Sequence, residues 1–225
     1  MLTFLDNFEF DIQRDENLRK KYADLSPKDI LSNITKHDFI VYERILSEEF
    51  WDAYVSQRGD VQTWSRQSRN LHYAMMELPE YWEVRAKENN GIVVDCGEIK
   101  ANIYFFSPVI ERIVKNVDWL NPDGTITKTD HYNRRGQKYA VTSLQLVSYQ
   151  ANGTEILLHN HSNDTVIEYS TDGHVKYCDT TLKTFTARIL NAIAKDGKEE
   201  VSLVTHDEAS WKELLGDDTH VSICI

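Results

Sequence analysis

The sequence carries one cluster of residue types that could bind a metal ion. It runs His159, Asn160, His161, Ser162, Asn163, Asp164. Histidines two positions apart on a strand project to the same face, as metal ligands would. Glu168 follows His161 by seven residues, which is longer than the spacing of a cupin-type metal motif. The alternative is that both histidines are polar residues at a strand end, and on this interpretation we expect no metal site.

No pattern for phosphate binding or nucleophilic catalysis occurs. The sequence lacks the glycine-rich loops G-x-x-x-x-G-K and G-x-G-x-x-G, and it also lacks the G-x-S-x-G elbow. Two carboxylate pairs, Glu48 with Glu49 and Glu199 with Glu200, are adjacent in the chain and so point apart. We therefore expect no catalytic residue and no cofactor.

Composition excludes several classes of protein. The formal net charge of −11 argues against a nucleic-acid partner, and a hydrophobic content of 41% is enough for a packed core. No apolar run approaches the roughly 18 residues of a membrane helix, and the first residues lack a basic region, so we expect a cytoplasmic protein. Cys96, Cys178 and Cys224 fit neither a disulfide framework nor a metal knuckle, and we interpret them as buried small hydrophobes.

Regular turn signals between Tyr81 and Tyr177 predict an antiparallel meander. Turn clusters recur there about every 10–12 residues through most of the region, and residues 100–178 carry eight basic and eight acidic side chains. The turns contain glycines that can adopt the positive φ of tight hairpins, at Gly124, Gly136, Gly153 and Gly173.

The segment from Thr125 to Tyr132 has polar residues on both alternating faces. Such a strand cannot lie between two apolar cores. We therefore expect part of the sheet to be open to water on both sides, or to be covered by another chain.

The flanking segments mix helix and strand signals. We expect a helix start at Ser26, Pro27 and Asp29, a strand at Phe39–Tyr42, and a helix that buries Phe50, Trp51 and Tyr54. After the meander come a helix with Leu182, Phe185, Ile189, Leu190 and Ile193 on one face and a terminator at Gly197, and then strand, helix, strand. We therefore divide the chain into a mixed α/β segment (1–76), an extended β-sheet domain (77–178), and a helix followed by the start of a Rossmann-like unit (179–225).

Four blocks resemble the accessory Sec system glycosylation chaperone family of GtfB-like subunits. They are LPEYWEV (78–84), IKANIYF (99–105), RIVKNVDWLNPDGTI (112–126) and HYNRRGQKYAVT (131–142), in the family's order. A wider similarity is to the extended β-sheet domain of bacterial glycosyltransferases that modify proteins or wall polymers, where a comparable D-x-Y-x-x-x-G hairpin occurs. The first 70 residues match poorly.

The resemblance implies an α+β fold, in which an antiparallel extended β-sheet domain is flanked by α/β elements of an incomplete Rossmann-like, GT-B-like domain. It implies a non-catalytic subunit that binds a catalytic glycosyltransferase and a Ser/Thr-rich adhesin polypeptide during protein O-glycosylation, with transfer of N-acetylglucosamine by the partner. It also allows peripheral membrane association through the complex and a homo-oligomer through the sheet.

The contacts with transferase and acceptor are expected on the sheet. A near-neutral sheet with an exposed edge can hold an uncharged extended chain by main-chain hydrogen bonds and aromatic contacts. The candidate residues for binding the partner and the acceptor are Trp119, Tyr132, Arg134, Arg135 and Tyr139. The alternative for these residues is sheet packing and a solvated hairpin tip. Because family members are roughly twice this length, a second hypothesis is the N-terminal half of an active retaining UDP-sugar glycosyltransferase, with its donor site beyond Ile225.

Overall fold

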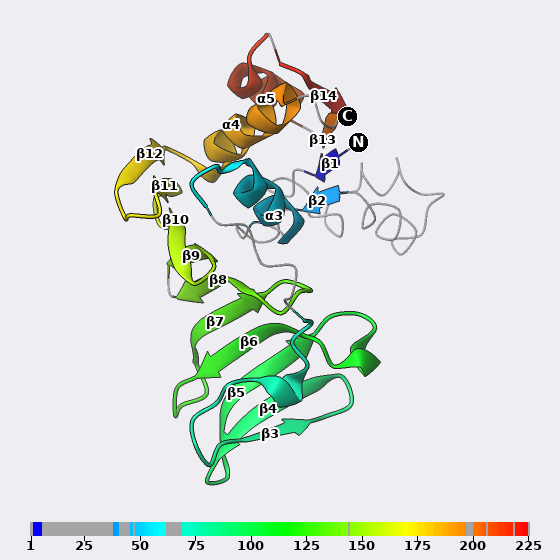
Figure 1. Cartoon of the computed structure of the whole chain (residues 1–225), viewed down its shortest axis with the longest axis vertical. Coiled ribbons are helices and arrows are strands. Elements are labelled where there is room, and N and C mark those ends of the chain that lie inside the picture. Colours follow the sequence, from blue (N-terminus) through cyan, green and yellow to red (C-terminus); the bar gives the residue numbers. More distant parts are fainter. Residues whose placement is uncertain are drawn as a thin grey trace. The chain divides into compact units, whose positions relative to one another are not determined.

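The computed structural model describes residues 2–5, 38–40, 46, 48–61, 69–143, 145–196, 200–205, 207–217 and 219–224. The chain divides into two compact units (Figure 1). The first combines residues 1–58 with residues 179–225, and the second comprises residues 59–178. Both ends of the chain therefore belong to one unit, and the second unit is inserted between them.

The first unit contains a parallel sheet of four strands in the order β14-β13-β1-β2. The strands are β1 (Leu2–Leu5), β2 (Asp38–Ile40), β13 (Val201–Val204) and β14 (Val221–Cys224). β1 pairs in parallel with β2 on one side and with β13 on the other. The expected strand–helix–strand unit at the end of the chain is thus confirmed, and its strands share a sheet with the start of the chain. The expected helix start at 26–29, the continuation of the strand to 41–42 and the terminator at 197 lie outside the described residues.

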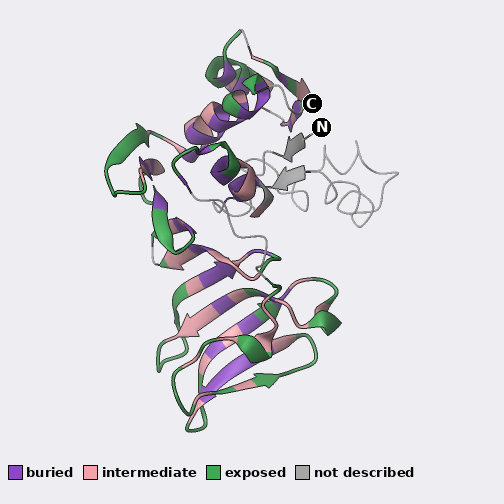
Figure 2. Cartoon of the chain, in the orientation of Figure 1, coloured by how far each residue is buried: buried purple, intermediate pink, exposed green. Residues whose placement is uncertain are grey.

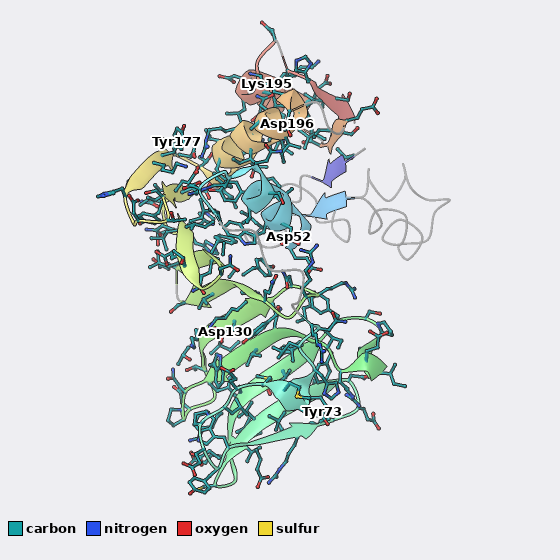
Figure 3. The ribbon with its side chains drawn as sticks, viewed as in Figure 1. Asp52, Tyr73, Asp130, Tyr177, Lys195 and Asp196 are labelled. Carbon is teal, nitrogen blue, oxygen red and sulfur yellow. The ribbon has the colours of Figure 1, made fainter. Side chains whose placement is uncertain are left out.

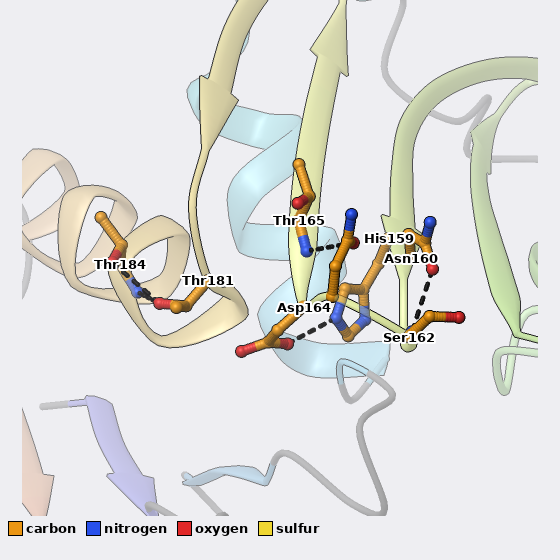
Figure 4. A network of polar contacts seen from close by, with 8 residues as sticks. His159, Asn160, Ser162, Asp164, Thr165, Thr181 and Thr184 are labelled. Carbon is orange, nitrogen blue, oxygen red and sulfur yellow. Dashed lines mark hydrogen bonds and ion pairs between the residues drawn. The ribbon is translucent and has the colours of Figure 1, made fainter.

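Helices α3 (Glu48–Gln57) and α4 (Leu182–Lys195) of the first unit bury the residues predicted from periodicity. A further helix, α5 (Glu208–Leu215), buries Trp211 and Leu215. The ring of Phe185 on α4 lies 6.3 Å from that of Phe50 and 5.4 Å from that of Tyr54, both on α3. α4 begins because the Thr181 hydroxyl oxygen accepts a hydrogen bond from the Thr184 amide at 2.9 Å (Figure 4).

The second unit contains an antiparallel meander in which every strand pairs with its neighbours in sequence. This confirms the α+β fold class. The ten strands are β3 (Glu83–Ala86), β4 (Asn90–Asp95), β5 (Glu98–Phe105), β6 (Val114–Leu120), β7 (Ile126–Tyr132), β8 (Lys138–Ser143), β9 (Leu146–Ala151), β10 (Thr154–Asn160), β11 (Thr165–Tyr169) and β12 (Val175–Asp179). The four turn glycines have φ between 75° and 85°, as their hairpins require.

Cys96 and Cys178 are exposed, so our interpretation of them as buried hydrophobes is wrong. Cys96 has a φ of 48° beside Gly97 in the hairpin between β4 and β5, a tight turn that projects from the sheet. Cys178 lies on β12, a strand at the edge of the sheet whose residues are almost all exposed (Figure 2). Cys96 is thus exposed because it lies in a hairpin turn, and Cys178 because it lies on an edge strand.

One face of the sheet at β4–β6 is covered by a neighbouring segment of the chain. Its buried cluster consists of Val93, Ala101, Ile103, Phe105, Val114 and Val117. Residues of the segment that precedes β3 pack against it, namely Leu71, Tyr73, Met76, Leu78 and Trp82. The segment is fixed to β6 by a hydrogen bond from the Val114 amide to the Leu71 carbonyl at 2.8 Å.

Strand β7 is open on both faces over only part of its length. Ile126, Thr127 and Lys128 are consecutive and all exposed, so both faces of the strand reach solvent there. Asp130 and His131 are consecutive and both buried. The expectation of a strand open to water on both sides therefore holds for the first half of β7 and is wrong for the second half, where cross-strand partners enclose the polar groups.

Candidate functional site

Trp119 packs within the sheet and hydrogen-bonds to a buried carboxylate. Its indole Nε1 on β6 donates a hydrogen bond to Oδ2 of Asp130 on β7, at 2.9 Å (Figure 3). The ring lies 6.4 Å from that of Trp82, and Lys128 Nζ is 5.6 Å from its centre. The polar end of Trp119 is thus engaged inside the chain, while its partly exposed ring retains some surface for contact.

The Asp130 carboxylate is held between two lysines. Lys138 Nζ lies 3.8 Å from Oδ2 and Lys128 Nζ lies 3.9 Å from Oδ1. Tyr132 is two positions further along β7, and burial, followed by the charges of Asp130 and Glu77, raises the pKa of its phenol to about 12. Tyr132 is therefore protonated at neutral pH and can donate a hydrogen bond.

The two arginines belong to the hairpin between β7 and β8, where Asn133 fixes the turn. Asn133 is 1% exposed, and its Oδ1 accepts from the amides of Arg135 at 3.1 Å and Gln137 at 3.0 Å. The Arg134 guanidinium lies 4.7 Å from the centre of the Phe106 ring and donates to the Ser107 carbonyl at 3.4 Å. Arg134 therefore links the hairpin to the β5–β6 connection, whereas Arg135 is exposed at the tip.

Tyr139 is buried, with 8% of its surface exposed, and its ring lies 6.4 Å from that of His131. Among the five residues selected from the sequence, it offers a partner little area. The structure brings Trp119 and Tyr132 together around Asp130, and it places Arg134 and Arg135 on the adjoining hairpin.

Sequence reasoning missed two rows of polar side chains on the opposite face of the same strands. Directly paired residues share a face, so the register places them side by side across β5, β6, β7 and β8. The first row is Asn102, Asp118, Thr129 and Thr142, and the second is Tyr104, Asn116 and His131. The signal that could have revealed them is the polar residue at every second position of β5 and β6.

Hydrogen bonds connect the members of these rows. The Thr129 hydroxyl donates to Asp118 Oδ1 at 2.7 Å. His131 Nδ1 lies 3.3 Å from Asn116 Oδ1, and His131 Nε2 lies 2.8 Å from Thr142 Oγ1. Burial lowers the pKa of His131 to about 4, so the imidazole is neutral at physiological pH and the rows carry a single charge, that of Asp118.

The sheet ends in two edge strands, β3 and β12. All residues of β12 except Asp179 are exposed, including Val175 at 62% and Tyr177 at 53%. An edge strand presents main-chain donors and acceptors on its outer side, which makes it a template for an added strand.

His159 lies on β10, and His161 stands in the turn that follows this strand. His159 is fully buried, and its Nε2 lies 2.8 Å from Asp164 Oδ1 (Figure 4). The rings of His159 and His161 are 4.6 Å apart. Asn160 Oδ1 accepts from the Ser162 amide at 2.9 Å in the same turn. Among the described residues, no group of three or more His, Cys, Asp or Glu side chains has an arrangement that could hold a metal ion.

Comparison with known proteins identifies the meander. A family model described as the GtfB middle domain matches residues 82–179. Residues 82–179 of this chain are therefore similar to the GtfB middle domain. This confirms the resemblance seen in the sequence, and the matched segment covers β3 to β12 in full.

The curated relatives of this segment share one name, that of a glycosyltransferase stabilizing protein. The UDP-N-acetylglucosamine–peptide N-acetylglucosaminyltransferase stabilizing protein GtfB of Streptococcus parasanguinis is 35% identical over 97 residues, which is 40% of this chain and 22% of that protein. Its counterpart in Streptococcus gordonii is 29% identical over 104 residues, 43% of this chain and 23% of that protein. The similarity therefore spans less than a quarter of each relative.

The fold extends this similarity beyond the middle domain. The crystal structure of a GtfA/B complex bound to UDP and GlcNAc contains a chain that matches 96% of this one with a TM-score of 0.60 and 16% identity, over 46% of its own length. At that identity the match shows the fold alone. Of the helices that the structure describes, none is long and apolar enough to cross a membrane.

Proposed function

We propose that this chain acts as a non-catalytic subunit that binds and stabilises a catalytic glycosyltransferase and helps to hold its Ser/Thr-rich adhesin acceptor. The observation that carries the proposal is the GtfB-type middle domain at residues 82–179, whose curated relatives are named as stabilizing proteins of a peptide N-acetylglucosaminyltransferase. On this proposal the partner transfers N-acetylglucosamine from its UDP donor, and this chain supplies surface and no reacting group.

The exposed parts of the sheet support a docking role. β12 offers an outer edge with exposed Val175 and Tyr177, and a partner strand can add there through main-chain hydrogen bonds. The hairpin between β7 and β8 places Arg135 at an exposed tip, beside Arg134, which is anchored on Phe106. An exposed cation at a hairpin tip suits an acidic patch of a partner, because opposite charges attract across an interface.

The test is co-expression of the full chain with a catalytic peptide N-acetylglucosaminyltransferase subunit. We expect the two to co-elute in size-exclusion chromatography and the transferase to melt at a higher temperature in the complex. At a subunit concentration about 100-fold above Kd, mass action stabilises the transferase by about 2.7 kcal/mol. Separate elution together with an unchanged melting temperature contradicts the proposal.

A further inference from the structure

The two polar rows on β5–β8 form a surface with its own chemistry, distinct from the covered face. The buried apolar cluster and the segment that precedes β3 lie on the opposite side of these strands. On the row side, Tyr104 is 43% exposed, and Asn102, Asn116, Asp118 and Thr129 are partly exposed. Amides, hydroxyls and one phenol therefore meet solvent on a single face.

We infer that this face, defined by Asn102, Tyr104, Asn116, Asp118, Thr129 and Thr142, binds an extended, uncharged, hydroxyl-rich segment of polypeptide. The inference rests on the proposed function and assigns its acceptor contact to the polar face, rather than to the strand edge or the Trp119 side.

Spacing supports an extended chain as the occupant. Asn102 on β5 pairs with Asp118 on β6, and Asn116 on β6 pairs with Tyr104 on β5. Asn102 and Asn116 are therefore diagonal neighbours on adjacent strands. Such diagonal neighbours are about 7–8 Å apart. Alternate residues of an extended chain are separated by about 7 Å, twice the rise of about 3.4 Å per residue. Two amides can therefore meet alternate residues of one strand-like segment.

The hydrogen-bonding capacity of these groups selects the occupant's chemistry. A side-chain amide has two donors and a carbonyl oxygen, so it can pair with a peptide group or with a hydroxyl. Asn116 contacts His131 through its Oδ1, and its amide NH₂ offers further donors. Asp118 is the only charged side chain in the rows, so an acidic segment is repelled there while a neutral one is accepted.

Tyr104 supplies the apolar contact that amides and hydroxyls lack. Burial, followed by the nearby charge of Asp118, raises the pKa of its phenol, so the hydroxyl stays protonated. The ring stands on β5 at one end of the second row, directly opposite Asn116. A half-exposed tyrosine ring buries area on binding with little loss of side-chain freedom, because it has few rotatable bonds.

Binding of a fluorescently labelled peptide of alternating serine and alanine to the full chain tests the inference. We expect the double variant Asn102→Ala/Tyr104→Ala to raise Kd by at least about tenfold, the equivalent of one or two lost hydrogen bonds. The matched control is Thr165→Ala/Tyr169→Ala, which removes a hydroxyl and a tyrosine from β11 on the other face of the sheet and should leave Kd unchanged. Binding should be insensitive to salt because the peptide is neutral.

The inference is overturned by equal affinity of the double variant and the wild type, or by equal weakening by the control variant. Displacement of the peptide by free N-acetylglucosamine, which indicates a saccharide site, also overturns it. Co-elution with the transferase is measured on the same samples. If the wild-type chain co-elutes but does not bind the peptide, the polar-face inference fails alone. If it does neither, the proposed function fails as well.

Discussion

Gly124 and Gly136 occupy the same position in two hairpins of the sheet but have different surroundings. In each turn, the glycine amide donates to the carbonyl three residues earlier at 2.9 Å, and φ is 83° at Gly124 and 75° at Gly136. A Cβ at Gly124 would meet nothing within 4 Å. A Cβ at Gly136 would lie 2.6 Å from both the Arg69 carbonyl oxygen and the Leu71 amide nitrogen. The two positions therefore separate backbone strain from a steric clash.

The expected losses of stability differ by the cost of that clash. An alanine in the left-handed region costs about 1–2 kcal/mol at either position. At Gly136 the Cβ also has to displace residues 69–71, whose Leu71 carbonyl accepts from the Val114 amide at 2.8 Å. Loss of this hydrogen bond costs about 1 kcal/mol. Displacement of the segment that covers the apolar cluster adds a further loss of stability. We expect Gly136→Ala to lower the free energy of unfolding by about 3–4 kcal/mol and Gly124→Ala by about 1–2 kcal/mol.

Denaturant-dependent hydrogen exchange of the β6 and β7 amides measures both values in the full chain. This reports opening of the sheet itself and does not require the two units to unfold together. Circular dichroism of each variant in the absence of denaturant checks that the native state is retained. Equal losses at the two glycines refute the reasoning, because they would mean that residues 69–71 yield at no cost.

Three further substitutions test individual contacts of the sheet. Burial lowers the pKa of His131 from 6.5 to about 4, so stability that is complete above pH 6.5 should fall as the pH drops towards 4, by about 3 kcal/mol. Urea titrations should show this pH dependence in the wild type and its loss in His131→Gln. Trp119→Phe removes the hydrogen bond to a buried carboxylate and should cost about 2–3 kcal/mol in urea unfolding, against about 1 kcal/mol for the matched control Trp82→Phe. Arg135→Glu should weaken co-elution with the transferase while Lys87→Glu, an exposed charge reversal in another turn, does not, and equal behaviour of the two variants removes Arg135 from the interface.

The meander could be predicted because the residues that form many of its turns lie close in sequence to the strands that they join. Several hairpins contain a glycine or asparagine within a few residues of the strands that they join, as at Gly153 and Gly173, and every strand of the meander pairs with its sequence neighbour. The joining of both ends of the chain in one parallel sheet could not be predicted. β1 pairs with β2 and with β13, which begins at Val201, and no local pattern reports a pairing across that separation.

The candidate site was less predictable because it depends on which face is covered. The alternation of Asn102 and Tyr104, or of Asn116 and Asp118, is visible in the sequence. Whether those residues or their neighbours face solvent depends on the segment around Leu71, which packs on the other side. The β-bulges in the pairs β4–β5 and β6–β7 also shift the register, so that a strict period of two does not carry through.

The burial of Asp130 and His131 follows from contacts across strands. Asp130 accepts from Trp119, eleven positions earlier, and His131 lies between Asn116 and Thr142. The polar side chains of a strand that is polar on both faces can thus be hydrated by solvent or hydrogen-bonded to polar residues on the flanking strands. The first half of β7 is exposed to solvent, and the second half has polar partners on β6 and β8. Sequence alternation alone does not distinguish them.

The edge and the polar face of this sheet offer different chemical groups to a chain that would bind there. The outer edge of β12 offers main-chain groups, which accept any strand whose own amides are free and are therefore indifferent to its side chains. The rows on β5–β8 offer only side chains, so they discriminate by charge and by hydroxyl content. On the proposed function, a subunit that holds one partner firmly and an uncharged acceptor chain loosely would use both kinds of surface. Pairing of sequence neighbours in the meander leaves an edge strand at each end and a polar face between them.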